Sequence, residues 1–161
     1  MNYFMSLNAR LAGAVLSVAS ACLALLGLVV IYGVIMRYGF NSAPAYVEQV
    51  ALLLVISVAM FGAAAGVHDA GHIGLDSVVK MLPLKAQFLC HVVVQLLTLG
   101  FATILVWGSI QMGLSTHLDQ IPTLGISEAY RYLPAIISGS LIIAFSFEHL
   151  IALFISTPSA E

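Results

Sequence analysis

The chain has 161 residues, of which 61% are hydrophobic and 7% are charged, whereas about a quarter of the residues in a soluble domain are charged. This composition excludes a soluble globular domain and predicts a membrane protein. The net charge of −2 provides no basic surface, so we expect no nucleic-acid partner.

Four long stretches without charged residues predict four transmembrane helices. Each stretch approaches or exceeds the roughly 20 residues that a helix needs to cross ~30 Å of hydrocarbon. In chain order we expect helices near residues 11–36, 48–67, 87–115 and 132–154. Unpaired backbone groups are costly in lipid and no stretch alternates like a barrel strand, so the sequence predicts an all-α integral membrane protein. We expect a single transmembrane domain over residues 1–161.

A short amphipathic helix is expected near residues 73–82, between the second and third spans. Its apolar side chains recur at helical spacing on one face, at Leu75, Val78, Val79 and Leu82. Asp76 and Lys80 form an acid-to-base pair on another face. Such a helix would lie in the membrane interface and contact lipid headgroups. A solvated connector is the alternative.

The basic residues of the short loops set the expected orientation. The N-terminal segment and the second loop share Arg10, Lys80 and Lys85, while the first and third loops hold Arg37 and Arg131. Because basic residues favour the cytoplasmic side, we expect both termini in the cytoplasm.

The segment from His68 to Asp76 resembles a zinc-binding helix. His68 and His72 are four residues apart and would share a helix face, and Asp76 could add a third ligand. A metalloprotease also needs a general base beside the metal, and Gly71 and Gly74 weaken a helix here. The alternative is that these polar residues lie in the headgroup region after the second span.

Three histidines in or beside the third and fourth spans raise the possibility of haem binding. Two histidines on facing helices can ligate a haem, as in a membrane anchor subunit of a respiratory complex. His117 should lie at the opposite membrane surface from His91, so only His91 and His149 could share a haem. The alternative is hydrogen bonding between helices or at the headgroups.

Glu148 is the one acidic residue in the interior of an expected span, since Glu48 is at the boundary of the second span. A charge at the bilayer centre costs roughly 2.5–3.5 kcal/mol on insertion scales. Its place late in the fourth span favours the inner headgroups, and a proton relay or a buried contact with another subunit are the alternatives.

Small residues at packing spacing predict close contacts between helices. Gly62 and Gly66 are four residues apart in the second span, and similar sets occur in the first and fourth spans. The spans carry few polar groups at mid-depth, whereas a chain that moves ions alone needs more of them. These faces therefore favour contact between helices over an aqueous pore.

Short motifs in a fixed order resemble those of one transporter family. They are Arg37-Tyr38-Gly39-Phe40-Asn41, Tyr46-Val47-Glu48-Gln49, Phe61-Gly62-Ala63-Ala64, His72-Ile73-Gly74-Leu75-Asp76, and Ile121-Pro122-Thr123-Leu124-Gly125-Ile126 followed by Tyr130 and Pro134. With their spacing, they resemble the small membrane subunit, the DctQ-like or Q-type subunit, of tripartite ATP-independent periplasmic (TRAP) transporters.

The resemblance implies a non-enzymatic scaffold subunit in the bacterial inner membrane, with no cofactor. In that family a large multi-span membrane subunit carries the sodium and substrate sites and moves by an elevator mechanism. A periplasmic substrate-binding protein delivers an organic acid, such as a C4-dicarboxylate or sialic acid. The expected partners are these two proteins and membrane lipids.

The resemblance also suggests residues for subunit contact or docking, which are Arg37, Tyr46, Glu48, His72, Asp76, Pro122 and Tyr130, with Gly62 and Gly66 for helix packing. The family motif contains His72 and Asp76 and does not contain the pair of His68 and His72, which argues against the hypothesis of a zinc site. Tyr46 stands where the family has Trp, Gln49 replaces a second Glu, and His68 replaces a residue that is often basic. A salt bridge between Arg37 and Glu48 is the internal alternative to docking.

Overall fold

The structure, a computed structural model, describes residues 2–42, 44–70, 83–121 and 123–155. Within these residues the chain is helical, with an isolated bridge between Gln120 and Ser127 as the extended contact. The elements are α1 (Asn2–Gly39), α2 (Ala45–Ala70), α4 (Leu84–Ser115), the 3-10 helix η1 (Glu128–Tyr132) and α5 (Leu133–Ile155). The predicted all-α class is confirmed.

In the described part of the chain, four helical segments are long and apolar enough to cross a membrane, and the fourth includes η1 together with most of α5: Arg10–Gly39, Ala45–Asp69, Ala86–Ser115 and Glu128–Leu153. The prediction of four transmembrane helices is therefore confirmed. α1 continues past Arg10 and Arg37, and α2 past Glu48 and Asp69, because a charge must leave the hydrocarbon but need not leave the helix. The interfacial helix expected near 73–82 lies outside the described residues.

The turn between α1 and α2 follows from a few local residues. Gly39 ends α1, and Asn41 adopts a positive φ of 51°, which asparagine tolerates better than most residues. The Ser42 N–H donates to the Met36 carbonyl over 3.1 Å, so the end of α1 is closed by the turn. Pro44 precedes α2 and accepts from the Val47 N–H over 3.1 Å. The end of α1 and the start of α2 are therefore held close together.

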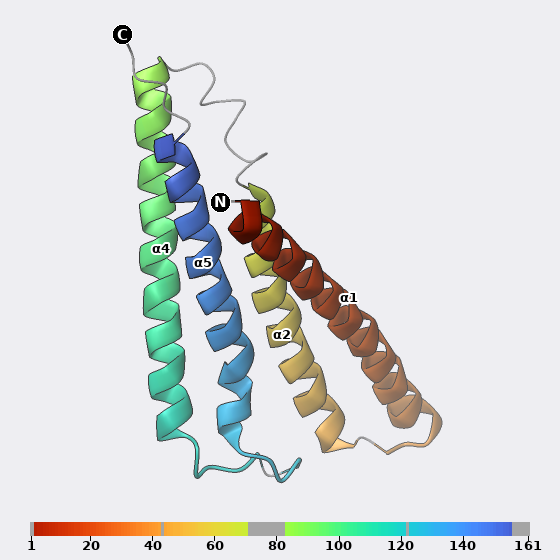
Figure 1. Ribbon diagram of the computed structural model, residues 1–161. Coiled ribbons are helices and arrows are strands. Elements are labelled where there is room, and N and C mark those ends of the chain that lie inside the picture. Colours follow the sequence, from red (N-terminus) through yellow and green to blue (C-terminus); the bar gives the residue numbers. More distant parts are fainter. Residues whose placement is uncertain (1, 43, 71–82, 122, 156–161) are drawn as a thin grey trace.

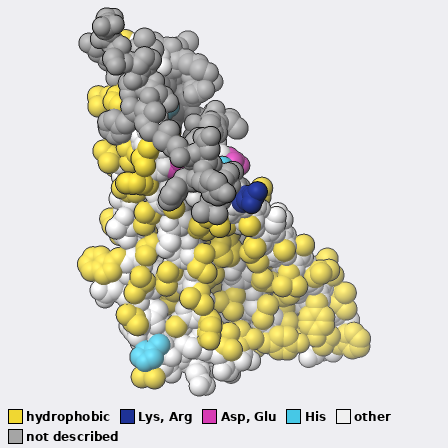
Figure 2. Space-filling model, viewed as in Figure 1, with side chains coloured by type: hydrophobic (Ala, Val, Ile, Leu, Met, Phe, Trp, Pro, Cys, Tyr) yellow, Lys and Arg dark blue, Asp and Glu magenta, His cyan; other side chains and the backbone are white. Residues whose placement is uncertain are grey.

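The helices form a layer in the order α4, α5, α2 and α1 (Figure 1). They converge at the end that holds the start of α1 and the ends of α2 and α5, and they spread apart at the end where α1 joins α2. We call these the convergent end and the loop end. Helices at the edges of a layer leave wide faces uncovered, and on the face in Figure 2 hydrophobic side chains extend along the helices.

The core is small and is built mainly from small side chains. Val15, Ala64, Ala102 and Ile142 form a cluster contributed by all of the long helices. At Gly139 an added Cβ would lie 2.6 Å from Val106 Cγ2, so glycine allows α5 to approach α4 closely.

Gly62 and Gly66 do not make such an approach inside the described part of the chain. A Cβ added at either position would meet nothing within 4 Å. Their neighbours Ala64 and Ala65 are buried instead. Packing of Gly62 and Gly66 against another chain stays a prediction.

Candidate functional site: polar contacts at the two ends of the helix layer

An ion pair links α1 to α2 at the loop end. Arg37 Nη2 lies 3.1 Å from Glu48 Oε1, and the two side chains are 57% and 74% exposed. Arg37 is in the last turn of α1 and Glu48 in the first turn of α2, so each charge also complements its helix dipole. The internal salt bridge expected as an alternative to docking is confirmed, and its exposure leaves both groups accessible.

Tyr46 lies on a different face of the same helix pair. Its hydroxyl group is 3.0 Å from that of Tyr32, and either group can be the donor. Both side chains are exposed. Its polar contact, like that of Glu48, is therefore with α1, and a role of Tyr46 in docking stays a prediction.

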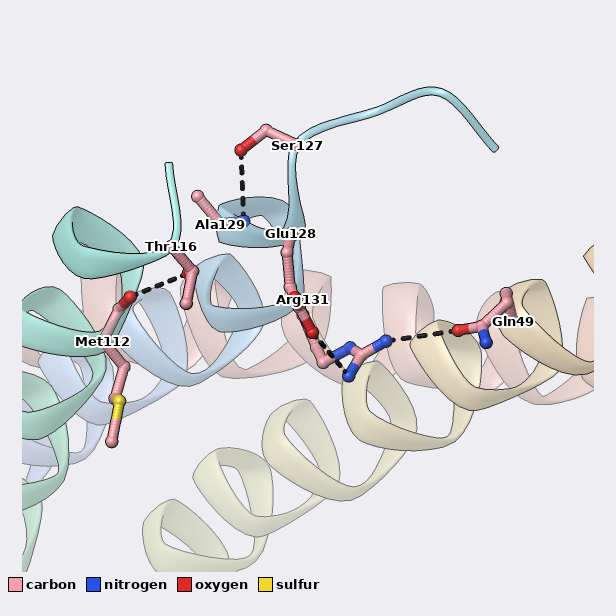
Figure 3. Close-up of polar contacts among 7 residues, drawn as sticks. All are labelled: Gln49, Met112, Thr116, Ser127, Glu128, Ala129 and Arg131. Carbon is pink, nitrogen blue, oxygen red and sulfur yellow. Dashed lines mark hydrogen bonds and ion pairs between the residues drawn. The ribbon is translucent and has the colours of Figure 1, made fainter. Parts of the chain in front are cut away.

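Arg131 connects η1 to α2 across the spread part of the layer (Figure 3). Arg131 Nη2 donates to Gln49 Oε1 over 3.2 Å, and Nη1 lies 3.1 Å from Glu128 Oε1. The side chain is 26% exposed, and its Nε is buried without a partner among the described residues. Gln49, which the sequence marks only as a departure from the family pattern, therefore links α2 to η1 at the loop end.

A compact turn precedes η1, the short helix that carries Arg131. The Ile121 N–H donates to the Ile126 carbonyl over 2.9 Å, and Gly125 has a φ of 64°, which favours glycine. The Ser127 hydroxyl accepts from the Ala129 N–H at the start of η1 (Figure 3). Tyr130 is more than half exposed on η1. Pro122 lies outside the described residues.

A second set of contacts joins three helices at the convergent end. Asn8 Nδ2 on α1 donates to Glu148 Oε2 on α5. Asn8 is buried and Glu148 is half-buried. The sequence suggests three roles for Glu148, which are a position at the inner headgroups, a proton relay or a buried contact with another subunit. The structure provides a partner inside the chain, 140 positions away.

His68 at the end of α2 completes this set. Its ring meets Phe145 edge-on, with centroids 5.0 Å apart, and lies 6.4 Å from the ring of His149. Its Nδ1 is 3.3 Å from Asp69 Oδ1. Among the described residues no group of three or more His, Cys, Asp or Glu is placed to hold a metal ion. His72 and Asp76 lie outside those residues, so the zinc hypothesis involving them is not tested.

His91 and His149 lie toward the same end of the layer, because α4 and α5 run in opposite directions, and His117 lies at the other end. His91 is near the start of α4 and His149 near the end of α5, whereas His117 follows α4 at the loop end. Close to His91, Gln95 Nε2 donates to the Ser146 carbonyl over 3.1 Å. The Ser146 hydroxyl is buried without a partner among the described residues. The hydrogen bond from Gln95 to Ser146 connects α4 to α5 next to Phe145, which packs against the ring of His68.

Together, these features define a multi-pass membrane protein in which, among the described residues, one set of polar contacts joins helices at each end of the layer. Residues 26–155 match the family described as tripartite ATP-independent periplasmic transporters, DctQ component. This match covers most of the chain, so the chain belongs to that family, which is a component of transporters in the inner membrane. The family resemblance read from the motifs is confirmed.

Two proteins of Haemophilus influenzae are similar to the chain, and each is named "Putative TRAP transporter small permease protein". One is 26% identical over 110 residues, which are 68% of this chain and 67% of the relative. The other is 28% identical over 131 residues, which are 81% of each protein.

Proposed function

We propose that the chain is the small scaffold subunit of a sodium-coupled TRAP transporter for organic acids, such as C4-dicarboxylates, sialic acid or similar compounds. In this proposal it braces a large elevator-type membrane subunit, which carries the sodium and substrate sites. It also helps a periplasmic substrate-binding protein to dock. The chain performs no chemical reaction and forms one transmembrane domain.

The observation that carries this proposal is how the described helices use their hydroxyl groups. Each of the following side chains donates to a carbonyl one turn earlier in its own helix: Ser17, Ser20, Ser57, Thr98, Thr103 and Ser140. The hydrogens of these hydroxyl groups are therefore used within their own helices, which supports a scaffold better than a solute path, and the buried Ser146 hydroxyl is an exception among the described residues. Transport sites at mid-depth instead need polar groups or interrupted helices that face one another.

We place the loop end in the periplasm and the convergent end, with both termini, in the cytoplasm. The supporting argument is the distribution of Arg10, Lys80 and Lys85 on one side of the membrane. In this orientation the exposed side chains of Arg37, Glu48 and Tyr130 face the periplasmic protein. His72, Asp76 and Pro122 remain further contact residues by family resemblance.

The test is purification of the tagged full chain from membranes, followed by uptake assays of the assembled transporter. We expect a much larger multi-span subunit to co-purify. Glu48→Ala and Arg37→Ala should reduce uptake by weakening assembly or docking, while the affinity of the periplasmic protein for substrate stays unchanged. Asp69→Ala is the matched control, since this carboxylate is 68% exposed at the opposite end. A missing large subunit, or equal losses in Asp69→Ala and Glu48→Ala, would contradict the proposal.

A further inference from the structure

A pocket of about 300 Å³ lies between α1 and α2 at the loop end. Its lining includes Val30, Val34 and Ala51 as apolar residues and Arg37 and Glu48 as charged residues. At Gly33 an added Cβ would lie 2.9 Å from Val47 Cγ1, so α1 and α2 are in close contact at this part of the pocket wall. The pocket is therefore a groove with apolar walls and one charged edge.

The charged edge offers both signs of charge to a ligand. The ion pair uses one guanidinium nitrogen of Arg37 and one carboxylate oxygen of Glu48, and both side chains are more than half exposed. A guanidinium has five N–H donors and a carboxylate has two oxygens, so each group retains bonding capacity. A ligand that fits must present an anion to Arg37 and a cation to Glu48.

The groove covers the same depth in the membrane as a lipid headgroup and the upper part of its acyl chains. Arg37 and Tyr38 are at the end of a membrane-spanning segment, where charged and tyrosine side chains meet the headgroup region. Val30 lies deeper on α1, by about 10 Å at ~1.5 Å per residue. The apolar walls therefore extend from the headgroup level into the hydrocarbon.

We propose that this groove binds one phospholipid whose headgroup carries both an ammonium and a phosphate, as in phosphatidylethanolamine. The phosphate bonds to Arg37, the ammonium bonds to Glu48, and the upper part of an acyl chain lies along Val30, Val34 and Ala51. An anionic headgroup without an ammonium would leave Glu48 beside a phosphate and is disfavoured. The inference depends on the membrane placement of α1 and α2 and not on the scaffold role.

The test is native mass spectrometry of the purified full chain mixed with phosphatidylethanolamine or phosphatidylglycerol. We expect the wild type to retain one phosphatidylethanolamine in preference to phosphatidylglycerol. Val34→Trp should fill the groove and reduce retention by about tenfold, which corresponds to about 1.4 kcal/mol of binding free energy. Ile35→Trp is the matched control, because Val34 and Ile35 are 51% and 53% exposed and only Val34 lines the groove.

A charge variant at Glu48 separates the contribution of the headgroup contacts to lipid binding from that of the acyl contacts. Glu48→Gln should remove the preference for phosphatidylethanolamine while retaining some lipid, because the groove itself is intact. Circular dichroism of each variant checks that the helices form. Equal retention of both lipids by the wild type, equal losses in both tryptophan variants, or loss of the lipid when the large subunit is bound would overturn the proposal. The last result would indicate that a protein side chain occupies the groove.

Discussion

The two ends of the helix layer use polar side chains in different surroundings. At the convergent end Asn8 is buried where it meets Glu148, and His68 packs against the fully buried Phe145. At the loop end Arg37 and Glu48 pair while remaining mostly exposed. Polar contacts removed from water are costly to break, whereas exposed ion pairs contribute about 0–1 kcal/mol. The contacts at the convergent end should therefore contribute more to the stability of the fold, and the exposed pair of Arg37 and Glu48 should be free to contact other molecules.

The largest expected effect on stability comes from Asn8→Leu. It leaves the half-buried Glu148 carboxylate without its donor, and hydrogen bonds to charged groups are worth about 1.5–3 kcal/mol. We expect a clear fall in the thermal midpoint of the protein in detergent. Adding Glu148→Gln to Asn8→Leu should recover part of the loss, since it removes the unpaired charge. An unchanged midpoint for Asn8→Leu would show that the convergent end does not hold the fold.

His68→Ala should have the next largest effect. It removes the edge-on contact with Phe145, and such ring contacts are worth about 0.5–1.5 kcal/mol beyond the area they bury. His68→Phe keeps a ring in this position and should melt close to the wild type. If the phenylalanine variant is as unstable as the alanine variant, the contact of His68 with Asp69 or His149 matters more than the ring packing.

At the loop end Arg131→Ala should cost about 0.5–1.5 kcal/mol, because it releases Gln49 and Glu128 together. Arg131→Lys is the control for charge, since a lysine cannot reproduce the planar fork that reaches both partners. The lysine variant should therefore show most of the loss. Full stability of the lysine variant in the same melting assay would mean that charge alone explains the contact.

The smallest expected effect is that of Arg37→Ala, below about 1 kcal/mol. A double-mutant cycle with Glu48→Ala should give a coupling free energy in the same range, and added salt should reduce it. A coupling well above this range would remove the contrast between the two ends.

The sequence predicts the helices but not the order in which they pack. Long uncharged stretches determine the four spans because lipid tolerates little else. These spans are apolar on all sides, so no hydrophobic stripe marks which face packs against which neighbour. The order α4, α5, α2 and α1 is therefore visible only in the structure.

The site was predictable where its residues are close in sequence. Arg37 and Glu48 flank one short turn, so their ion pair could be expected. Asn8 and Glu148 are 140 positions apart, and nothing in the sequence around Asn8 marks it as a partner. Gln49 and Arg131 are also far apart in the sequence, and the sequence marks Gln49 only as a departure from a family pattern. Their contact was therefore not predictable.

The most direct test of the scaffold function is organic-acid uptake by proteoliposomes that contain this chain alone, or this chain with its large membrane subunit. The periplasmic protein and a sodium gradient are supplied in both cases. We predict sodium-driven accumulation when the large subunit is present and none with the chain alone. Accumulation by the chain alone would contradict the account, because it would place a transport path among helices assigned here to bracing.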